Sequence, residues 1–316
     1  MALERLELLI RYVREQTGNQ EYSANAGIPQ RNMVRHFNDG QEFIYNQILQ
    51  ERSTLFKKEG FINLVAGQAA YSLPSDVYLS HNIQKVDYTP TGDAKNYYPL
   101  NMRTPREEVS IRGYPEAYFL RDGKIIISPI PDTTIVNGIR LNYQYVIPYL
   151  DIRRATVMST DFDPVTKTVT SVDLMINSYL TTETTTELTG NWVDHICIVD
   201  KDGNILMQDL PVTGYDDGFI KTISIDPSFV AQTGETLPAN AFVVFGKNTS
   251  THSQLPVAAK KCLLTFVELR TQMADANSDA AETSPIMQAL IKDLLDSIAE
   301  LEEDIWQIPI INYDYI

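Results

Sequence analysis

Residues 116–129 decide the fold: Glu116-Ala-Tyr-Phe-Leu-Arg-Asp-Gly-Lys-Ile-Ile-Ile-Ser-Pro129. Asp122-Gly123 accepts the positive φ angles of a type I′ turn, so the stretch predicts a hairpin with strands over 116–121 and 124–129. Three consecutive isoleucines leave neither face of the second strand polar, which predicts that this strand is buried. Pro129 ends it, because proline cannot donate to a sheet ladder.

Further strands extend the β segment over residues 61–150. The pattern predicts them at 81–89, 97–102 and 138–147. The last of these carries apolar residues at every second position, as a half-buried strand does. The segment is therefore predicted to be an inserted antiparallel β domain.

Residues 151–256 are predicted to form a second inserted domain, all β. They contain 14 Asp and Glu residues against 6 Lys and Arg, and short apolar strands alternate with turns such as Asp200-Lys-Asp-Gly-Asn204. A threonine-rich patch, Thr181–Thr189, is expected to be an exposed β-hairpin or loop, with a polar binding surface as the alternative.

Helical patterns lie on both sides of the β segments. Apolar residues recur at helical spacing over 3–17 and 30–58, and Gly60 is expected to end the second helix. Helix resumes after Pro256, and a heptad-like seam over 287–305 is expected to pack against the N-terminal helices. The expected fold class is α+β: a helical bundle from both chain ends with an inserted antiparallel β domain and a second inserted all-β domain. The predicted domains are 1–60 (N-terminal helices), 61–150 (β segment), 151–256 (inserted all-β domain), 257–305 (C-terminal helices) and 306–316 (extended arm).

The bulk composition weighs against nucleic-acid binding through a broad basic surface. The chain has 316 residues, a formal net charge of −15 and no apolar run long enough to span a membrane. No secretory signal is expected, and the distant pair Cys197 and Cys262 fits a reduced compartment better than a disulfide framework. The acidic balance is that of a well-solvated protein or of a channel surface that repels DNA phosphates.

Residues that could carry chemistry are scattered. Phosphate-binding loops, the zinc-protease motif and the nucleophile elbow are missing, and His195 with Cys197 offers too few ligands for a metal. Acidic pairs in the second β domain are expected to be solvated turn residues. The segment that begins at Asp200 alternates like a calcium loop, but its twelfth position holds no glutamate, so a hairpin turn is expected. No catalytic residue, cofactor or metal is predicted, and the protein is not expected to be an enzyme.

The stretch 306–316, Trp-Gln-Ile-Pro-Ile-Ile-Asn-Tyr-Asp-Tyr-Ile, is unusual for a chain end because it is apolar and aromatic. It follows an acidic helical pattern, and Pro309 prevents that helix from continuing. The stretch is expected either to pack on its own domain or to add a strand to a neighbouring subunit. The candidate docking residues are Trp306, Ile308, Ile310, Tyr313, Tyr315 and Ile316.

Four motifs follow one another in the first half of the chain: Tyr71-Ser-Leu-Pro-Ser-Asp76, Gly113-Tyr-Pro-Glu-Ala-Tyr118, Ile126-Ile-Ser-Pro-Ile-Pro-Asp132 and Ile139-Arg-Leu-Asn-Tyr143. Their order and spacing resemble the head–tail connector (adaptor) proteins of tailed bacteriophages, particularly the short-tailed type. The resemblance covers about 1–150 and 257–305. The motif residues are Tyr71, Leu73, Pro74, Asp76, Gly113, Pro115, Tyr118, Pro129, Pro131 and Asp132.

The resemblance implies a structural virion protein of the neck or tail, assembled in the host cytoplasm. It implies a ring, usually of twelve copies, that lies below the portal, extends the DNA channel and provides a platform for tail assembly. The implied partners are the portal protein, tail or nozzle proteins and further copies of the chain; DNA would pass without sequence-specific binding, and no membrane is involved. The acidic end of the last helix would suit the channel or an interface. The candidate residues there are Glu300, Glu302, Glu303 and Asp304.

Residues 151–256 depart from the connector pattern, because simpler members of that class have only a loop at this point. A second hypothesis therefore makes this domain a carbohydrate- or receptor-binding module of the virion. A third makes the protein a hydrolase that uses scattered carboxylates. The connector hypothesis is preferred, because no catalytic motif accompanies the ordered β motifs.

Overall fold

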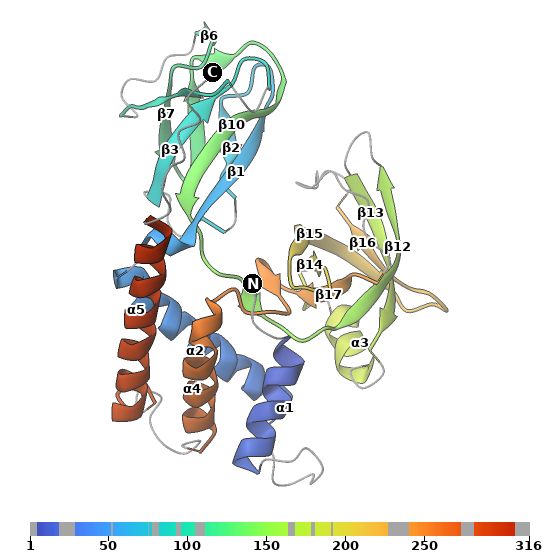
Figure 1. Cartoon of the computed structure of the whole chain (residues 1–316). Helices are drawn as coiled ribbons and strands as arrows, with labels where there is room; N and C mark the ends of the chain where they lie inside the picture. The colour runs from blue at the N-terminus through green and yellow to red at the C-terminus, as the bar shows by residue number, and fades with distance from the viewer. Residues whose placement is uncertain are drawn as a thin grey trace, which may run out of the picture. The chain divides into compact units, whose positions relative to one another are not determined.

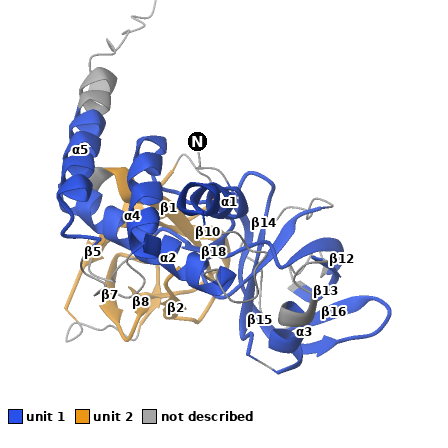
Figure 2. Cartoon of the chain, turned by 90° about the horizontal axis from the view of Figure 1, so that it is seen from below, with its two compact units in different colours: residues 1–51, 147–316 blue, residues 52–146 orange. Residues whose placement is uncertain are grey.

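A computed structural model gives the fold (Figure 1). The chain forms two compact units (Figure 2): unit 1 contains residues 1–51 and 147–316, and unit 2 contains residues 52–146. Unit 1 combines helices with a β-barrel and unit 2 is built from strands, so the predicted α+β class is confirmed at that level. The structure describes residues 5–18, 29–51, 53–74, 76–77, 82–92, 96–104, 111–163, 168–177, 181–190, 192–226, 240–272 and 281–306, without the side chains of 53–54, 162–163, 168, 181–183 and 300–306.

Unit 2 has two four-stranded sheets that share one apolar core. The strand orders are β1-β10-β3-β4 and β2-β8-β7-β5, and β6 with β9 forms a short parallel pair. The core takes Leu141 and Tyr143 from the first sheet and Ile125 and Ile127 from the second. The elements are a 3-10 turn (Ser53–Phe56), β1 (Lys57–Leu64), β2 (Ala70–Ser72), β3 (Ile83–Tyr88), β4 (Tyr98–Pro99), β5 (Asn101–Met102), β6 (Arg112–Gly113), β7 (Ala117–Arg121), β8 (Lys124–Ser128), β9 (Ile130–Pro131) and β10 (Ile135–Gln144).

The hairpin predicted from residues 116–129 is confirmed. Strands β7 and β8 pair antiparallel and close with Arg121 opposite Lys124. The two turn residues, Asp122 and Gly123, have φ angles of 52° and 71°, as a type I′ turn requires. All three isoleucines of β8 are buried, which agrees with a strand covered on both faces.

The predicted second helix is too long. Helix α2 (Gln30–Glu51) ends seven residues before the expected position, and residues 57–64 form strand β1 instead. Gly60 lies in the middle of that strand, opposite Leu141 of β10. A Cβ atom at Gly60 would lie 2.9 Å from the Tyr143 ring, so the glycine allows the close approach of an aromatic side chain and does not stop a helix.

Four helices of unit 1 pack against one another. Helix α4 contacts α1, α2 and α5, and α2 also contacts α1 and α5. Gly40 of α2 faces α4 closely, because a Cβ atom there would lie 2.7 Å from the Phe266 ring. The first part of the predicted seam of α5 is buried, from Met287 to Ile298. The helices are α1 (Leu6–Thr17), α2 (Gln30–Glu51), α4 (Lys260–Gln272) and α5 (Pro285–Trp306), with a 3-10 turn before α4 (Val257–Ala259).

The remainder of unit 1 is a closed antiparallel barrel with the strand order β12-β13-β16-β15-β14-β17. Its interior is apolar and includes Val172, Ile196 and Ile223. Strand β11 precedes the barrel strands in sequence and β18 follows them, and these two short strands pair in parallel. The strands are β11 (Tyr149–Leu150), β12 (Ala155–Asp163), β13 (Thr168–Ile176), β14 (His195–Val199), β15 (Ile205–Asp216), β16 (Lys221–Ile225), β17 (Phe242–Phe245) and β18 (Thr249–Ser250).

The threonine-rich patch is helix α3 (Thr181–Thr189), so the expectation of a hairpin or loop is wrong. Thr184 and Leu188 are buried one helical turn apart, and Leu188 belongs to the barrel core. The Thr189 hydroxyl donates to the Thr185 carbonyl at 2.8 Å, a bond that satisfies a threonine inside a helix. Burial of this one apolar side chain against the barrel therefore overrides the weak helix propensity of threonine.

The turn between β14 and β15 is the hairpin turn expected in place of a calcium loop. Asp200 organises it: Oδ1 accepts from Asn204 N at 2.8 Å, and Oδ2 accepts from Asn204 Nδ2 at 2.7 Å. Gly203 has a φ of 87°, and a Cβ atom there would lie 2.5 Å from Cβ of His252. Only glycine fits both the backbone angle and this contact.

Replacing Gly203 by alanine is expected to lower the free energy of unfolding by about 3 kcal/mol, since left-handed strain and overpacking against His252 both apply. Gly123→Ala is the matched control. Gly123 also has a positive φ, but a Cβ atom there would have no neighbour within 4 Å, so a loss of about 1 kcal/mol is expected. Urea unfolding of both variants measures the difference; equal losses would refute the role of the His252 contact.

Candidate functional site

Asp76, the last residue of the first motif, is a buried carboxylate in unit 2. It accepts hydrogen bonds from the Tyr143 hydroxyl at 2.8 Å and from Lys58 Nζ at 2.7 Å. Burial and the nearby carboxylate raise the pKa of Tyr143, so the hydroxyl keeps its proton. The Asp76 carbonyl accepts from Val146 N at 2.7 Å. Asp76 therefore ties the segment after β2 to β1 and β10.

The other motif residues also lie in unit 2. Tyr71 and Tyr118 are in the core, and the Tyr71 hydroxyl donates to the Gln68 carbonyl at 2.8 Å. Gly113 pairs with Pro131 in the β6–β9 ladder. The structure thus brings motifs that are far apart in sequence into one β unit. Of the rest, Leu73 packs against the core, Pro115 is buried, Pro74 and Pro129 are half-buried and Asp132 is exposed.

The predicted docking arm lies almost entirely outside the described residues. Helix α5 includes Trp306 as its last residue, and the described part of the chain ends there. The acidic candidates occupy the last two turns of α5, where the structure describes the backbone and not the side chains. The arm residues outside the described ranges are Ile308, Ile310, Tyr313, Tyr315 and Ile316; the acidic residues on α5 are Glu300, Glu302, Glu303 and Asp304.

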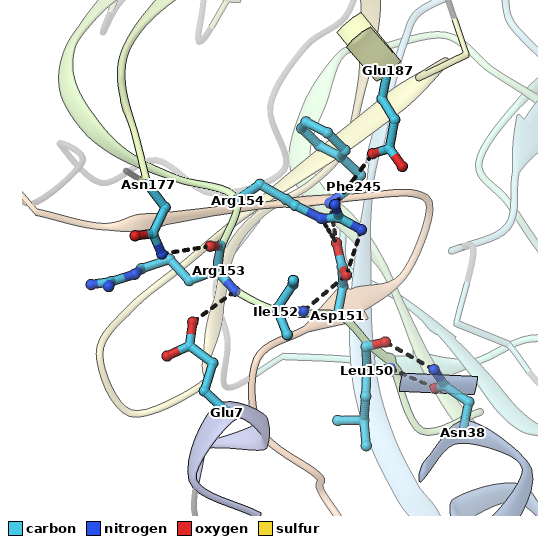
Figure 3. A network of polar contacts seen from close by, with 10 residues as sticks. All are labelled: Glu7, Asn38, Leu150, Asp151, Ile152, Arg153, Arg154, Asn177, Glu187 and Phe245. Carbon is cyan, nitrogen blue, oxygen red and sulfur yellow. Dashed lines mark hydrogen bonds and ion pairs between the residues drawn. The ribbon is translucent and has the colours of Figure 1, made fainter. Parts of the chain in front are cut away.

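A buried ion pair lies in unit 1, where the segment after β11 leads into the barrel (Figure 3). Arg154 Nε lies 2.9 Å from Asp151 Oδ2, and Nη2 lies 3.1 Å from Oδ1. The two side chains are only 11% and 9% exposed. Glu187 of α3 approaches Arg154 Nη1 to 3.4 Å, and the guanidinium lies over the Phe245 ring. Arg154 therefore joins the segment to both α3 and the barrel.

Side chains from α1 and α2 hold the same segment. The side-chain amide of Asn38 in α2 makes two hydrogen bonds with the backbone of Leu150. Asn38 Nδ2 donates to Leu150 O at 2.9 Å, and Asn38 Oδ1 accepts from Leu150 N at 2.7 Å. Glu7 of α1 accepts from Arg153 N at 3.3 Å, and Asn177 Nδ2 donates to Arg153 O at 3.2 Å. We call the following residues the junction network: Glu7, Asn38, Asp151, Arg154, Asn177 and Glu187.

A hollow of about 580 Å³ opens beside the junction network, and we call it the junction hollow. The start of α2, the segment 149–154, the residues after α3 and the β17–β18 connection line it. Trp192 and Tyr149 contribute aromatic side chains that are 71% and 56% exposed. A volume of this size is within the range of ligand pockets, so the hollow can hold a cluster of side chains from a partner.

Arg31 and Lys247 carry the unpaired positive charge of the junction hollow. Neither makes a hydrogen bond or ion pair through its side chain with another residue in the described ranges. Burial, and next to it the charge of Lys247, lower the pKa of His195, so this lining imidazole is neutral at neutral pH. The Asp151 and Glu187 carboxylates are engaged by Arg154, which leaves Asp194 as the other described lining acid.

Sequence reasoning did not single out the junction network or the junction hollow. The one local signal was the adjacent pair Arg153-Arg154, in a stretch with only 6 Lys and Arg. The contact between Asn38 and Leu150 joins positions 112 residues apart, which a single sequence does not reveal. Exposed Trp192 and Tyr149 look like ordinary core residues when only their neighbours in sequence are known.

The described residues offer little for redox or metal chemistry. Cys197 and Cys262 are free and buried, and burial raises the pKa of each thiol to about 11, so neither is a thiolate at neutral pH. Within the described ranges, no group of three or more His, Cys, Asp or Glu residues is placed to hold a metal ion. The described helices include none that is both long and apolar enough to cross a membrane.

The residues of the connector motifs lie together in unit 2, and the four helices of unit 1 pack against one another. The model of the family described as SU10 adaptor protein matches residues 6–165, which is half of the chain. The chain therefore belongs to the SU10 adaptor protein family, a family of phage head–tail adaptors, and is a structural component of a bacteriophage virion. The predicted resemblance is confirmed over α1, α2 and unit 2. No curated protein matches the chain.

Proposed function

We propose that this protein forms a ring between the portal and the tail, extends the DNA channel and provides a platform for tail assembly. The observation that carries the proposal is the family match, which spans α1, α2 and the whole of unit 2 with its ten motif residues. The proposed partners are the portal protein, tail or nozzle proteins and eleven further copies of the chain in a dodecamer. Association of this kind needs no cofactor and no catalysis.

In this proposal the segments of the chain have different tasks. Residues 1–60 and 257–305 form the helical bundle of the connector core, and 61–150 is its β segment. Residues 151–256 are an inserted domain that thickens the ring or contacts tail proteins. The stretch 306–316 is an arm that docks on the portal or on the adjacent subunit. This division is supported by the packing of α4 with α1, α2 and α5.

The acidic balance of the chain supports a role at a DNA channel. The formal net charge is −15, and residues 275–304 contain nine Asp and Glu residues against one Lys. Four of these acids lie at the C-terminal end of α5, where the helix dipole disfavours negative charge. A surface that must not bind phosphates would account for them, since like charge lets DNA pass with little friction.

Purified protein, alone and mixed with purified portal protein, tests the proposal. Analytical ultracentrifugation at several concentrations is expected to show a species of many subunits, formed alone or on the portal. The stoichiometry of the complex gives the copy number. A strict monomer that also fails to join the portal would contradict the adaptor function. If the protein does not join the portal but is retained on host polysaccharide, a receptor-binding role for residues 151–256 would be favoured.

A further inference from the structure

The junction hollow exposes two large aromatic side chains that most folded domains would cover. Trp192 is 71% and Tyr149 56% exposed, and both line the same hollow of about 580 Å³. Trp, Tyr and Arg are the residues that most often dominate binding energy at protein interfaces, especially where they line a pocket. Arg31 lines this hollow as well. The hollow therefore has the composition of an interface site.

The floor of the hollow is held by ion pairs. Arg154 holds Asp151 at 2.9 Å and Glu187 at 3.4 Å, and these three residues line the hollow. Preorganised lining residues lose little entropy when a partner binds. The hollow is thus prepared to receive side chains without rearrangement of the segment that supports it.

The positive charge that lines the junction hollow indicates which kind of segment could bind there. Arg31 and Lys247 have no side-chain partner among the described residues, in a chain with 26 Lys and Arg against 41 Asp and Glu. A complementary occupant combines aromatic or aliphatic side chains with carboxylates. Residues 306–316 of this chain combine Trp, Ile and Tyr side chains with one carboxylate, Asp314, and contain no Lys or Arg.

We propose that the arm 306–316 of a second copy of this chain docks in the junction hollow. A different copy is favoured because α5, which leads into the arm, contacts α2, α4 and the turn before α4, and α4 lies between α5 and the barrel in both views (Figures 1 and 2). Pro309 keeps the arm from continuing as a helix, so it enters as an extended segment. The inference rests on the proposed ring and names the contact that joins its neighbours.

The proposed contact has a consequence for assembly. The arm of one copy meets the hollow of the next, so two different surfaces are joined. Such a heterologous contact leaves one arm and one hollow free at the ends of any open chain of subunits. A closed assembly, either a ring or a dimer that exchanges its arms, satisfies all of them. The arm and the hollow would therefore favour a closed assembly over an open chain of subunits.

Photocrosslinking of the full chain tests the contact. Tyr149→benzoylphenylalanine places a photoreactive group at the hollow, and Phe219→benzoylphenylalanine, at a fully exposed hairpin residue that does not line the hollow, is the matched control. Isotope-labelled and unlabelled copies are mixed before illumination. The expected result is a crosslink from position 149 to residues 307–316 of the other copy, and no such crosslink from position 219. Crosslinks to the same copy, to the portal alone or to neither would overturn the inference.

Trp192→Ala provides a second measurement. The dissociation constant for association between subunits is expected to rise about tenfold or more, because an interface tryptophan is truncated. Phe219→Ala is expected to leave it unchanged. Circular dichroism checks that both variants fold. If wild type and Trp192→Ala assemble equally well, the arm contact is refuted while the adaptor function stands. A wild-type protein that is monomeric but still binds the portal would also refute the arm contact and leave the adaptor function standing. A monomer that binds neither itself nor the portal would refute the arm contact and the adaptor function together.

Discussion

Arg154→Ala is expected to lower the free energy of unfolding by about 3 kcal/mol, since removal of one partner leaves the buried Asp151 carboxylate uncompensated. Both side chains are nearly inaccessible, at 11% and 9% exposed, so solvent cannot replace the lost partner. The same change releases Glu187 of α3. Urea unfolding followed by circular dichroism measures the effect.

The adjacent residue gives a matched control. Arg153→Ala removes the same side chain one position earlier, where the guanidinium stacks on the Phe242 ring at 5.1 Å and the backbone atoms make the network contacts. A loss of about 1 kcal/mol or less is expected, because only a cation–π contact disappears. Equal losses in the two variants would show that the buried ion pair does not hold the segment between the helices and the barrel.

Asp76→Ala is expected to destabilise unit 2 by about 2 kcal/mol, because the buried Tyr143 hydroxyl loses its acceptor. Asp76 is 3% exposed and Tyr143 1% exposed, so water does not substitute for the carboxylate. The Lys58 side chain is 49% exposed, so the loss of its ion pair with Asp76 contributes little to the change in stability. Thermal and urea unfolding of the purified variant measure the loss. No change in stability would mean that the motif aspartate does not tie the strands of unit 2 together.

Tyr143→Phe separates the two partners. It removes the hydroxyl and leaves Asp76 with Lys58, so a smaller loss of about 1 kcal/mol is expected at neutral pH. Because burial raises the pKa of Tyr143 in the folded state, its contribution is present below about pH 10 and is lost as the pH rises further. The variant should therefore lose less stability than wild type above about pH 10. If Tyr143→Phe and wild type lose stability equally above about pH 10, the raised pKa of Tyr143 would be contradicted.

Local signals predicted the parts of the fold that depend on local geometry. The Asp122-Gly123 turn was found because a type I′ turn requires positive φ angles at both positions. The Asp200 turn was found for a similar reason, since short polar residues and Gly203 restrict its conformation. The motifs were recognised from their order along the chain, and the family match supports them.

Long-range contacts account for what the sequence did not reveal. Strand β1 continued the apolar spacing of α2, and only its pairing with β10, about eighty residues later, makes it a strand. Helix α3 is a helix because Leu188 enters the barrel core, despite its threonines. The junction network joins α1, α2 and α3 through contacts that no local pattern encodes. Tertiary packing thus decided each of these elements.

Imaging of the assembled virion by cryo-electron microscopy tests the adaptor account most directly. The account predicts a closed ring of this chain in direct contact with the portal, with the DNA channel passing through its centre. Density for the barrel of residues 155–245 would then lie on each subunit of that ring. Copies found only in fibres or spikes away from the portal, or no ring at the neck, would contradict the account.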